Sequence, residues 1–544
     1  MVNGHEVRPY GTWTSPITAA MVAAAGVRLG QIQISGETVY WLEGRPLEGG
    51  RGAIMRRTAD GQVMEAGPQD MNVRSRVHEY GGGDFLVHGD VLFFSNDADQ
   101  RLYRQAPGSA PVPITPEPDS PRALRYADGQ CTPDGRWILC VRESHDPAGR
   151  VRNELVAVSA DGSRPPRVVA SGRDFYAFPR ISPDGRRLAW TCWNMPNMPW
   201  DGAELWIADL GADGGITNAR RVAGGPRESV FQPQWSPAGT LHFISDRSGW
   251  WNLYRVQDDA VVPLAPMEND FGVAQWVFGL STYAFLADGT IACVYFENGL
   301  QRLALLHPES GRLEPLPAPW TSYAPAQVRS TGERLVFVAA SPVEPPAVIL
   351  YDPRSERSEV LRRSADLRID PGYVSVARPL EFPTTNGLTA HAFFYPPCNR
   401  DFAGPPDERP PLLVISHGGP TAHSPAELSL RVQYWTSRGF AVVDVNYGGS
   451  TGYGRAYRER LHGAWGVVDT EDCINAARHL VRTGEVDGKR MAIRGSSAGG
   501  YTTLCALVFH DVFAAGASYY GVADLETLAQ DTHKFEARYL DTLV

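Results

Sequence analysis

The sequence of 544 residues has no long apolar run: nowhere do about 18 apolar residues follow one another, the length that a membrane-spanning helix requires. It also has no basic run, and its formal net charge is -10 at pH 7. That balance argues against nucleic acid and against an anionic membrane surface as partners. The N-terminal residues lack the basic start and apolar stretch of a secretion signal. We therefore expect a cytoplasmic protein without a membrane segment.

Cysteine is sparse as well. The seven cysteines stand singly and form neither a CxxC pair nor a regular framework. This spacing fits reduced thiols in a cytoplasm better than disulfides, and we interpret the cysteines as small core residues. No His, Cys and Asp cluster has the spacing of metal ligands, so we predict no metal and no cofactor.

Apolar residues make up 43% of the chain and charged residues 21%. This content is sufficient for sizeable buried cores. Its length predicts two large domains or three smaller ones. Residues 1–30 form a separate N-terminal segment with a short helix-like piece at 17–27. We expect this segment to pack on the C-terminal domain.

Residues 31–368 carry an internal repeat. Each copy has a tight turn, then an apolar strand, then a more polar strand, and consecutive turn glycines are 43 to 54 residues apart. Short strands at this period predict a seven-bladed β-propeller, with an array of β-sandwich domains as the alternative. The turn glycines are Gly36, Gly89, Gly135, Gly185, Gly239, Gly289 and Gly332.

Three segments of the propeller depart from the repeat: 73–85, 192–206 and 245–256, the last two rich in Trp. Aromatic-rich loops can line a substrate passage, but tryptophans more often pack one blade against the next. We favour the packing interpretation.

Residues 369–544 have a different sequence pattern, which predicts strands that alternate with helices. A buried-type strand running into a glycine turn is predicted at 412–420 and another buried-type strand at 439–447, with helices at 425–437 and 468–482. This alternation indicates a mainly parallel sheet covered on both faces, an α/β architecture.

The stretch around Ser497 carries the strongest chemical signal. An apolar strand at 491–493 breaks into GSSAGG and resumes as a helix, the pattern of a nucleophilic serine on a sharp strand-to-helix turn. Gly495 and Gly499 flank Ser497 at two residues on either side, where a side chain would collide. The N–H of Ala498, at the start of the helix, would face developing negative charge. A glycine-rich loop without chemistry, or one that holds a phosphate, is the alternative.

A second signal is HGGP at 417–420, a glycine pair directly after a predicted central strand. Such a turn leaves backbone N–H groups free to point at a tetrahedral oxygen, and with Ala498 it would complete an oxyanion hole. The alternative is a plain strand-ending turn. His417 lies on the oxyanion side, so we predict a structural role for it.

A seven-bladed propeller followed by HGGP, NYGGSTGYG and GSSAGGY resembles the prolyl oligopeptidase family of serine peptidases, in its acylaminoacyl-peptidase and dipeptidyl-aminopeptidase branch. The resemblance implies an α/β-hydrolase domain at 369–544 with Ser497 as nucleophile. It also implies Ala498 and Gly419 as oxyanion donors. Short peptides would be the substrates, passing through an acyl-enzyme, and the propeller would restrict access to them.

The sequence also departs from the family pattern. The resemblance places the acid roughly 80 and the histidine roughly 110 residues after the serine, whereas 47 residues follow Ser497. His510 and His533 do not stand where the family's base would. The resemblance therefore implies a C-terminally truncated, incomplete hydrolase domain without the triad Asp and His, nearly inactive alone.

Two other functions remain open at this stage. A carboxylesterase shares the serine turn, and a propeller-based binding protein with a degenerate hydrolase remnant would show the same motifs. Dipeptidyl-type members hold the substrate's amino terminus with paired glutamates, and no Glu-Glu dipeptide occurs here. This tilts the prediction towards acylaminoacyl- or oligopeptidase-type cleavage.

Overall fold

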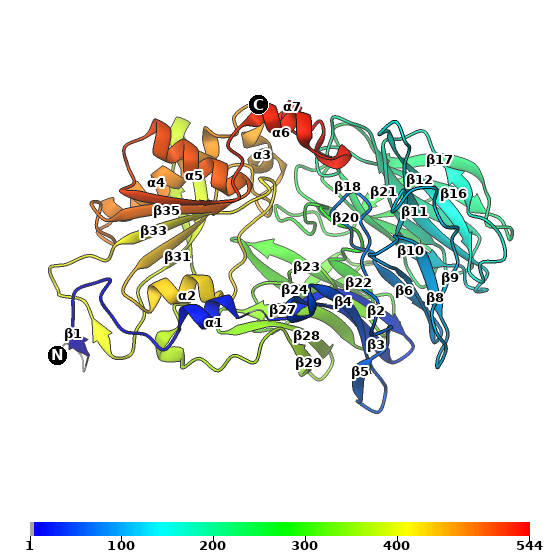
Figure 1. The fold of residues 1–544 in the computed structure, drawn as a ribbon, viewed down its shortest axis with the longest axis horizontal. Helices are drawn as coiled ribbons and strands as arrows, with labels where there is room; N and C mark the ends of the chain where they lie inside the picture. The colour runs from blue at the N-terminus through cyan, green and yellow to red at the C-terminus, as the bar shows by residue number, and fades with distance from the viewer. Residues whose placement is uncertain (1–4, 25) are drawn as a thin grey trace.

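The computed structural model describes residues 5–24 and 26–544. It contains seven four-stranded antiparallel sheets, and in each of them the strands lie side by side in chain order. The sheets surround a common axis as the blades of a propeller, which lies to the right of the second domain in Figure 1. The predicted seven-bladed propeller is therefore confirmed.

The strands of the seven blades have the following bounds. Blades 1 to 3 consist of β2 (Arg28–Ser35), β3 (Thr38–Arg45), β4 (Arg51–Arg57) and β5 (Val63–Glu65); β6 (Phe85–His88), β7 (Val91–Ser95), β8 (Leu102–Gln105) and β9 (Val112–Pro113); and β10 (Leu124–Cys131), β11 (Trp137–His145), β12 (Val151–Ser159) and β13 (Arg167–Ala170). Blades 4 and 5 consist of β14 (Phe175–Ile181), β15 (Arg187–Trp193), β16 (Glu204–Leu210) and β17 (Ile216–Gly224); and β18 (Val230–Trp235), β19 (Leu241–Ser245), β20 (Asn252–Gln257) and β21 (Ala260–Pro263). Blades 6 and 7 consist of β22 (Tyr283–Phe285), β23 (Ile291–Glu297), β24 (Leu300–His307) and β25 (Arg312–Pro315); and β26 (Arg329–Ser330), β27 (Leu335–Ser341), β28 (Glu344–Asp352) and β29 (Arg357–Arg363).

The seven glycines that mark the repeat all lie in the turn between the first and second strand of a blade. Their φ angles run from 56° to 100°, a left-handed region that a side chain would strain. The sequence repeat and the structural repeat thus coincide.

First and last blades are joined by side chains, because no sheet of the described chain combines strands from both. The side-chain oxygen of Gln327 accepts a hydrogen bond of 3.0 Å from the N–H of Ile32. Farther out, Arg57 forms an ion pair of 2.9 Å with Glu359. The ring closes through these contacts between blade 7 and blade 1.

The second domain is built on a six-stranded sheet of order β30-β31-β34-β33-β35-β36, whose last four strands are parallel. The predicted parallel α/β sheet is confirmed. Its strands are β30 (Arg378–Pro383), β31 (Thr389–Tyr395), β33 (Leu412–Ser416), β34 (Ala441–Asn446), β35 (Met491–Ser496) and β36 (Ala515–Tyr519).

Helices cover both faces of this sheet, α4 and α5 on one side and α2 with α1 on the other (Figure 1). The predicted helix at 468–482 is observed with the same bounds. The predicted helix at 425–437 begins five residues later, because the backbone of Leu428 and Ala426 is used to bind the propeller residues Ser341 and Thr321. The helices are α1 (Ala19–Ala23), α2 (Leu430–Thr436), α3 (Arg455–Arg458), α4 (Val468–Arg482), α5 (Ala498–Phe509), α6 (Leu525–Asp531) and α7 (Leu540–Leu543).

The N-terminal segment runs along the second domain. Strand β1 (Glu6–Val7) pairs in parallel with β32 (Phe402–Ala403), and the hydroxyls of Ser15 and Ser437 are 2.7 Å apart. Of the predicted helix at 17–27, α1 covers residues 19–23, and residue 25 lies outside the described part of the chain.

The three segments that break the repeat form the junction between the domains. Asp246 of the propeller contacts Arg455 at 2.8 Å and Arg458 at 2.7 Å, and Trp251 lies beneath the guanidinium of Arg458. Tyr80 donates a hydrogen bond of 2.6 Å to Glu536. Trp193, Trp200 and Trp251 are buried and Trp250 is partly buried. They pack between domains as well as between blades.

All seven cysteines lie in the described part of the chain as free thiols, and five of them are buried. No described helix combines the length and apolarity needed to cross a bilayer.

Candidate active site

Ser497 stands between β35 and α5, where the chain turns sharply. Its backbone has φ 54° and ψ -120°, a conformation that a residue with a Cβ adopts only when its surroundings impose it. Its N–H donates to the carbonyl of Tyr519 at 3.0 Å, which ties the turn to the neighbouring strand β36. The Ser497 side chain is exposed at the carboxyl end of the parallel strands, where α/β sheets place their ligand sites.

The glycines on either side of Ser497 leave no room for a side chain. A Cβ at position 495 would lie 2.1 Å from the carbonyl oxygen of Gly499. A Cβ at position 499 would lie 2.2 Å from the carbonyl oxygen of Ser416. Both distances are far below van der Waals contact, so the turn can form only with glycine at both positions.

The HGGP turn after β33 lies directly against this serine. A Cβ on Gly418 would be 3.1 Å from the carbonyl oxygen of Ser496 and 3.5 Å from the Cβ of Ser497. Gly419 follows with φ 127°, again a conformation for glycine. Ala498 is the first residue of α5, so its N–H has no acceptor within the helix. The structure thus brings Ser497, Ala498 and the glycine turn to one place.

Both ring nitrogens of His417 form hydrogen bonds. Its Nδ1 donates to the carbonyl of Gly418 at 2.8 Å, so that Nε2 accepts from the hydroxyl of Ser450 at 2.8 Å. The ring also stacks on Tyr447 at a centroid distance of 4.3 Å. Burial lowers its pKa to about 4, which keeps it neutral at pH 7. These contacts give His417 the structural role that the sequence analysis predicts.

The two histidines that follow Ser497 lie elsewhere. His510 is the exposed C-terminal cap of α5, and the ring of His533 packs edge-on against Tyr80. Within residues 5–24 and 26–544, no hydrogen bond joins a histidine to the hydroxyl of Ser497.

Two features at the domain junction escaped the sequence analysis. Phe535 inserts between rings of the propeller, stacking on His78 at 5.0 Å, and Lys534 donates to Asn153 at 2.9 Å. The sequence around Lys534 and Phe535 is polar and has no periodicity that would indicate a contact between the two domains.

The second feature is a cluster of Glu79, Glu143 and His145, whose ligand atoms lie within 4.8 Å of one another. The guanidinium of Arg125 already pairs with Glu79 at 2.5 Å and with Glu143 at 3.4 Å. The cation in this cluster is therefore an arginine, and Glu79 is far from Glu143 and His145 in the sequence.

The serine lies on a sharp strand-to-helix turn at the carboxyl edge of a parallel sheet, next to a glycine turn that follows the adjacent strand. This is the arrangement of the α/β-hydrolases. A seven-bladed propeller precedes the hydrolase domain in the chain and packs on it. Together the two domains define a propeller-bearing serine hydrolase.

Comparisons with known proteins identify the family. The profile of the Prolyl oligopeptidase family matches residues 426–544. A solved puromycin hydrolase is 43% identical, with a TM-score of 0.93, over 99% of this chain and 84% of that chain. A puromycin-hydrolyzing peptidase of Mycobacterium tuberculosis is 41% identical, with a TM-score of 0.94, over the same shares. Dipeptidyl aminopeptidase BIII of Pseudoxanthomonas mexicana is 30% identical over 234 residues, which is 42% of this chain and 34% of that protein. The chain belongs to the prolyl oligopeptidase family of serine peptidases.

Proposed function

We propose that this protein hydrolyses short peptides, of acylaminoacyl- or oligopeptidase type, through an acyl-enzyme on Ser497. The observation that carries the proposal is the exposed, strained Ser497 set against the HGGP turn. The domains that act together would be the N-terminal segment 1–30, the propeller 31–368 and the hydrolase domain 369–544. Peptides would be the partners, without nucleic acid, cofactor or metal, and the propeller would restrict access to the site.

The reaction follows from the groups at the turn. The Ser497 hydroxyl attacks the scissile carbonyl and gives up its proton to a base, while the carbonyl oxygen becomes an oxyanion. The N–H groups of Ala498 and Gly419 would bind that oxyanion, and one such donor contributes about 3 kcal/mol to lowering the barrier. The base then passes this proton to the leaving nitrogen, and departure of the amine leaves an acyl-enzyme, which water hydrolyses to the acid and free Ser497.

The substrate class rests on the relatives. Proteins named puromycin hydrolase and dipeptidyl aminopeptidase match this chain; the first name refers to hydrolysis of puromycin and the second to release of dipeptides. We propose puromycin and blocked or free dipeptide amides as substrates to test first, in a cytoplasmic setting.

We further propose that residues 1–544 by themselves turn over slowly. No described histidine reaches Ser497, so the proton acceptor of the triad would be missing. An oxyanion hole and binding alone leave roughly 10³- to 10⁴-fold acceleration over water. Comparing residues 1–544 with the polypeptide expressed from the whole reading frame tests this, and equal, robust rates in a frame that ends at Val544 would contradict it.

The function is tested on the polypeptide from the whole reading frame with a peptide 4-nitroanilide, puromycin and a 4-nitrophenyl ester. We expect amide hydrolysis, lost by roughly 10⁴- to 10⁶-fold in Ser497→Ala. The matched control is Ser496→Ala, which changes the adjacent serine of β35 and should keep the rate within a few-fold. Ester hydrolysis without amide hydrolysis would indicate a carboxylesterase. If neither the amides nor the ester are hydrolysed, the interpretation as a non-catalytic binding protein is favoured.

A further inference from the structure

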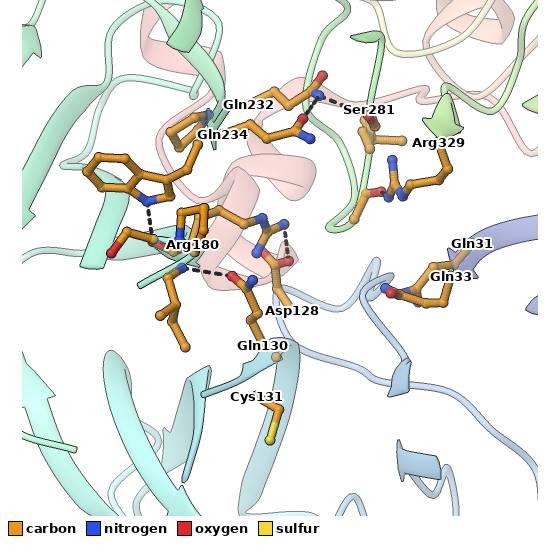
Figure 2. Close-up of a pocket in the computed structure, with 18 of the residues that line it drawn as sticks. Gln31, Gln33, Asp128, Gln130, Cys131, Arg180, Gln232, Gln234, Ser281 and Arg329 are labelled. Atoms are coloured by element: carbon orange, nitrogen blue, oxygen red, sulfur yellow. Dashed lines mark hydrogen bonds and ion pairs between the residues drawn. The ribbon is translucent and has the colours of Figure 1, made fainter. Parts of the chain in front are cut away.

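A polar cavity of about 400 Å³ lies in the centre of the propeller. Its walls come mainly from the first strands of five blades, β2, β10, β14, β18 and β26, and from residues 279–281 before β22. Figure 2 shows side chains from these segments facing a common space. The proposed reaction uses none of these residues.

None of the residues that line the cavity belongs to the hydrolase domain, and backbone crosses the propeller beside it. The N–H of Phe278 donates to the carbonyl of Gly81 at 2.9 Å, and the N–H of Asp128 donates to the carbonyl of Gly83 at 3.0 Å. Tyr80, beside this crossing, contacts the hydrolase domain through Glu536. The cavity is lined mainly by the later residues of the inner strands, and its lining residues are distinct from those around Ser497.

The charge in this cavity is unbalanced. Arg180 forms an ion pair of 2.7 Å with Asp128. Arg329 has no acidic partner among the described residues, and its guanidinium donates to the carbonyls of Ile32, Val328 and Gly279 at 2.9 to 3.2 Å. Burial lowers the pKa of Arg329 to about 10, so it stays charged at neutral pH. The cavity therefore carries one uncompensated positive charge.

Glutamine amides supply most of the other polar side chains, together with Ser182 and Ser281. Gln130 and Gln234 use their side-chain oxygens to accept from Ile181 and from Gln232, which leaves their NH₂ groups as donors. The side chain of Gln33 makes no hydrogen bond within residues 5–24 and 26–544, and Figure 2 shows it pointing towards the others. One guanidinium surrounded by amide donors is the chemistry of a site for a monoanion.

We propose that this cavity binds a short peptide by its free C-terminal carboxylate, which pairs with Arg329. The single uncompensated charge matches a monoanionic carboxylate better than a phosphate dianion. The glutamine side chains, which carry both donors and acceptors, match the amides of a peptide backbone. This site is independent of the chemistry at Ser497, and its occupancy is measured without turnover.

The test is titration calorimetry of the intact protein with acetyl-glycyl-glycine, with its C-terminal amide and with inorganic phosphate. The acid should bind at least about tenfold more tightly than the amide, because only the acid pairs with a buried guanidinium. Gln33→Glu places a like charge in the cavity without breaking a hydrogen bond and should weaken binding of the acid by at least about tenfold. Arg329→Gln should abolish it.

The matched control is Gln69→Glu, the same change at an exposed position of the propeller. It should leave binding unchanged. The proposal is overturned if acid and amide bind alike, if phosphate binds in place of the acid, or if Gln33→Glu leaves the affinity intact. It is equally overturned if nothing binds at ligand concentrations up to about 10 mM, the range of weak sites. Because Arg329→Gln could disturb the propeller through its three carbonyl contacts, Gln33→Glu decides the outcome.

Discussion

At position 497 the chain holds a serine in a conformation that costs roughly 1–3 kcal/mol. The surroundings impose it: its N–H bonds to Tyr519 and its carbonyl accepts from Gly500 at 2.9 Å. This strain leaves the hydroxyl exposed at the end of β35 instead of packed into the helix. The strained residue is the one that we propose as the nucleophile.

Replacement of Gly499 by alanine tests the packing of this turn. The new Cβ would meet the carbonyl oxygens of Ser416 and His417, at 2.2 and 2.7 Å, and backbone must move to admit it. We expect Gly499→Ala to lower the free energy of unfolding by about 3 kcal/mol and to abolish peptide hydrolysis. Gly225→Ala is the control, since a Cβ there meets nothing within 4 Å. Thermal unfolding and peptidase rates measure both effects, and a Gly499→Ala protein of wild-type stability would contradict the geometry.

At the scale of single elements, α4 supports the serine turn through a buried carboxylate. Asp469 on α4 accepts from the N–H of Gly466 at 2.6 Å and from the hydroxyl of Thr502 on α5. Burial raises its pKa to about 6, above the value of 3.8 for an unperturbed aspartate. The folded protein therefore binds this proton more tightly than the unfolded chain does.

The pH dependence of the free energy of unfolding follows from this raised pKa. The contribution of Asp469 to stability is full below about pH 4 and is lost as the pH rises to about 6, by up to about 3 kcal/mol. Asp469→Asn stays neutral, so we expect it to raise the melting temperature relative to wild type at pH 8 but not at pH 4. Thermal melts at both values measure this difference. An equal effect of Asp469→Asn at pH 4 and pH 8 would contradict the raised pKa.

The sequence predicts elements well where local signals agree. The helix 468–482 has acidic residues in its first turn and Gly484 after its end, and it is found at the predicted bounds. The turn glycines of the blades likewise predict all seven first-to-second-strand turns. The predicted start of α2 was wrong, because residues 425–429 bind the propeller. No local sequence pattern indicates such a tertiary contact.

Long-range contacts also explain what the sequence could not predict about the sites. Gly495 and Gly499 could be identified from one pentapeptide, since their role is steric and local. Arg329 and Gln33 are almost 300 residues apart, and only closure of the propeller brings them to one cavity. The roles of Trp251 and Phe535 at the domain junction depend in the same way on how two domains pack.

At the scale of the whole molecule, one buried carboxylate joins the propeller to the hydrolase domain. The side chain of Asp246 is fully buried between Arg455 and Arg458. Removing it leaves the buried guanidinium of Arg458 without an ion-pair partner and Arg455 with Glu459 alone, which destabilises by about 3–5 kcal/mol.

We expect Asp246→Ala to uncouple the two domains. Calorimetric unfolding should resolve into two transitions at lower temperature, where the wild type unfolds in one. The control is Glu297→Ala, which breaks an exposed pair with Arg302 and should change stability by less than about 1 kcal/mol. A single unshifted transition in Asp246→Ala would show that the domains hold together without this contact.

The most direct measurement for the account as a whole is covalent labelling with a fluorophosphonate, which forms an ester with an activated serine hydroxyl. The polypeptide from the whole reading frame is labelled, digested and mapped by mass spectrometry. The account predicts one adduct, on Ser497, that disappears in Ser497→Ala and persists in Ser496→Ala. A protein that hydrolyses peptides while its adduct lies on another serine, or while Ser497 stays unlabelled, would contradict it.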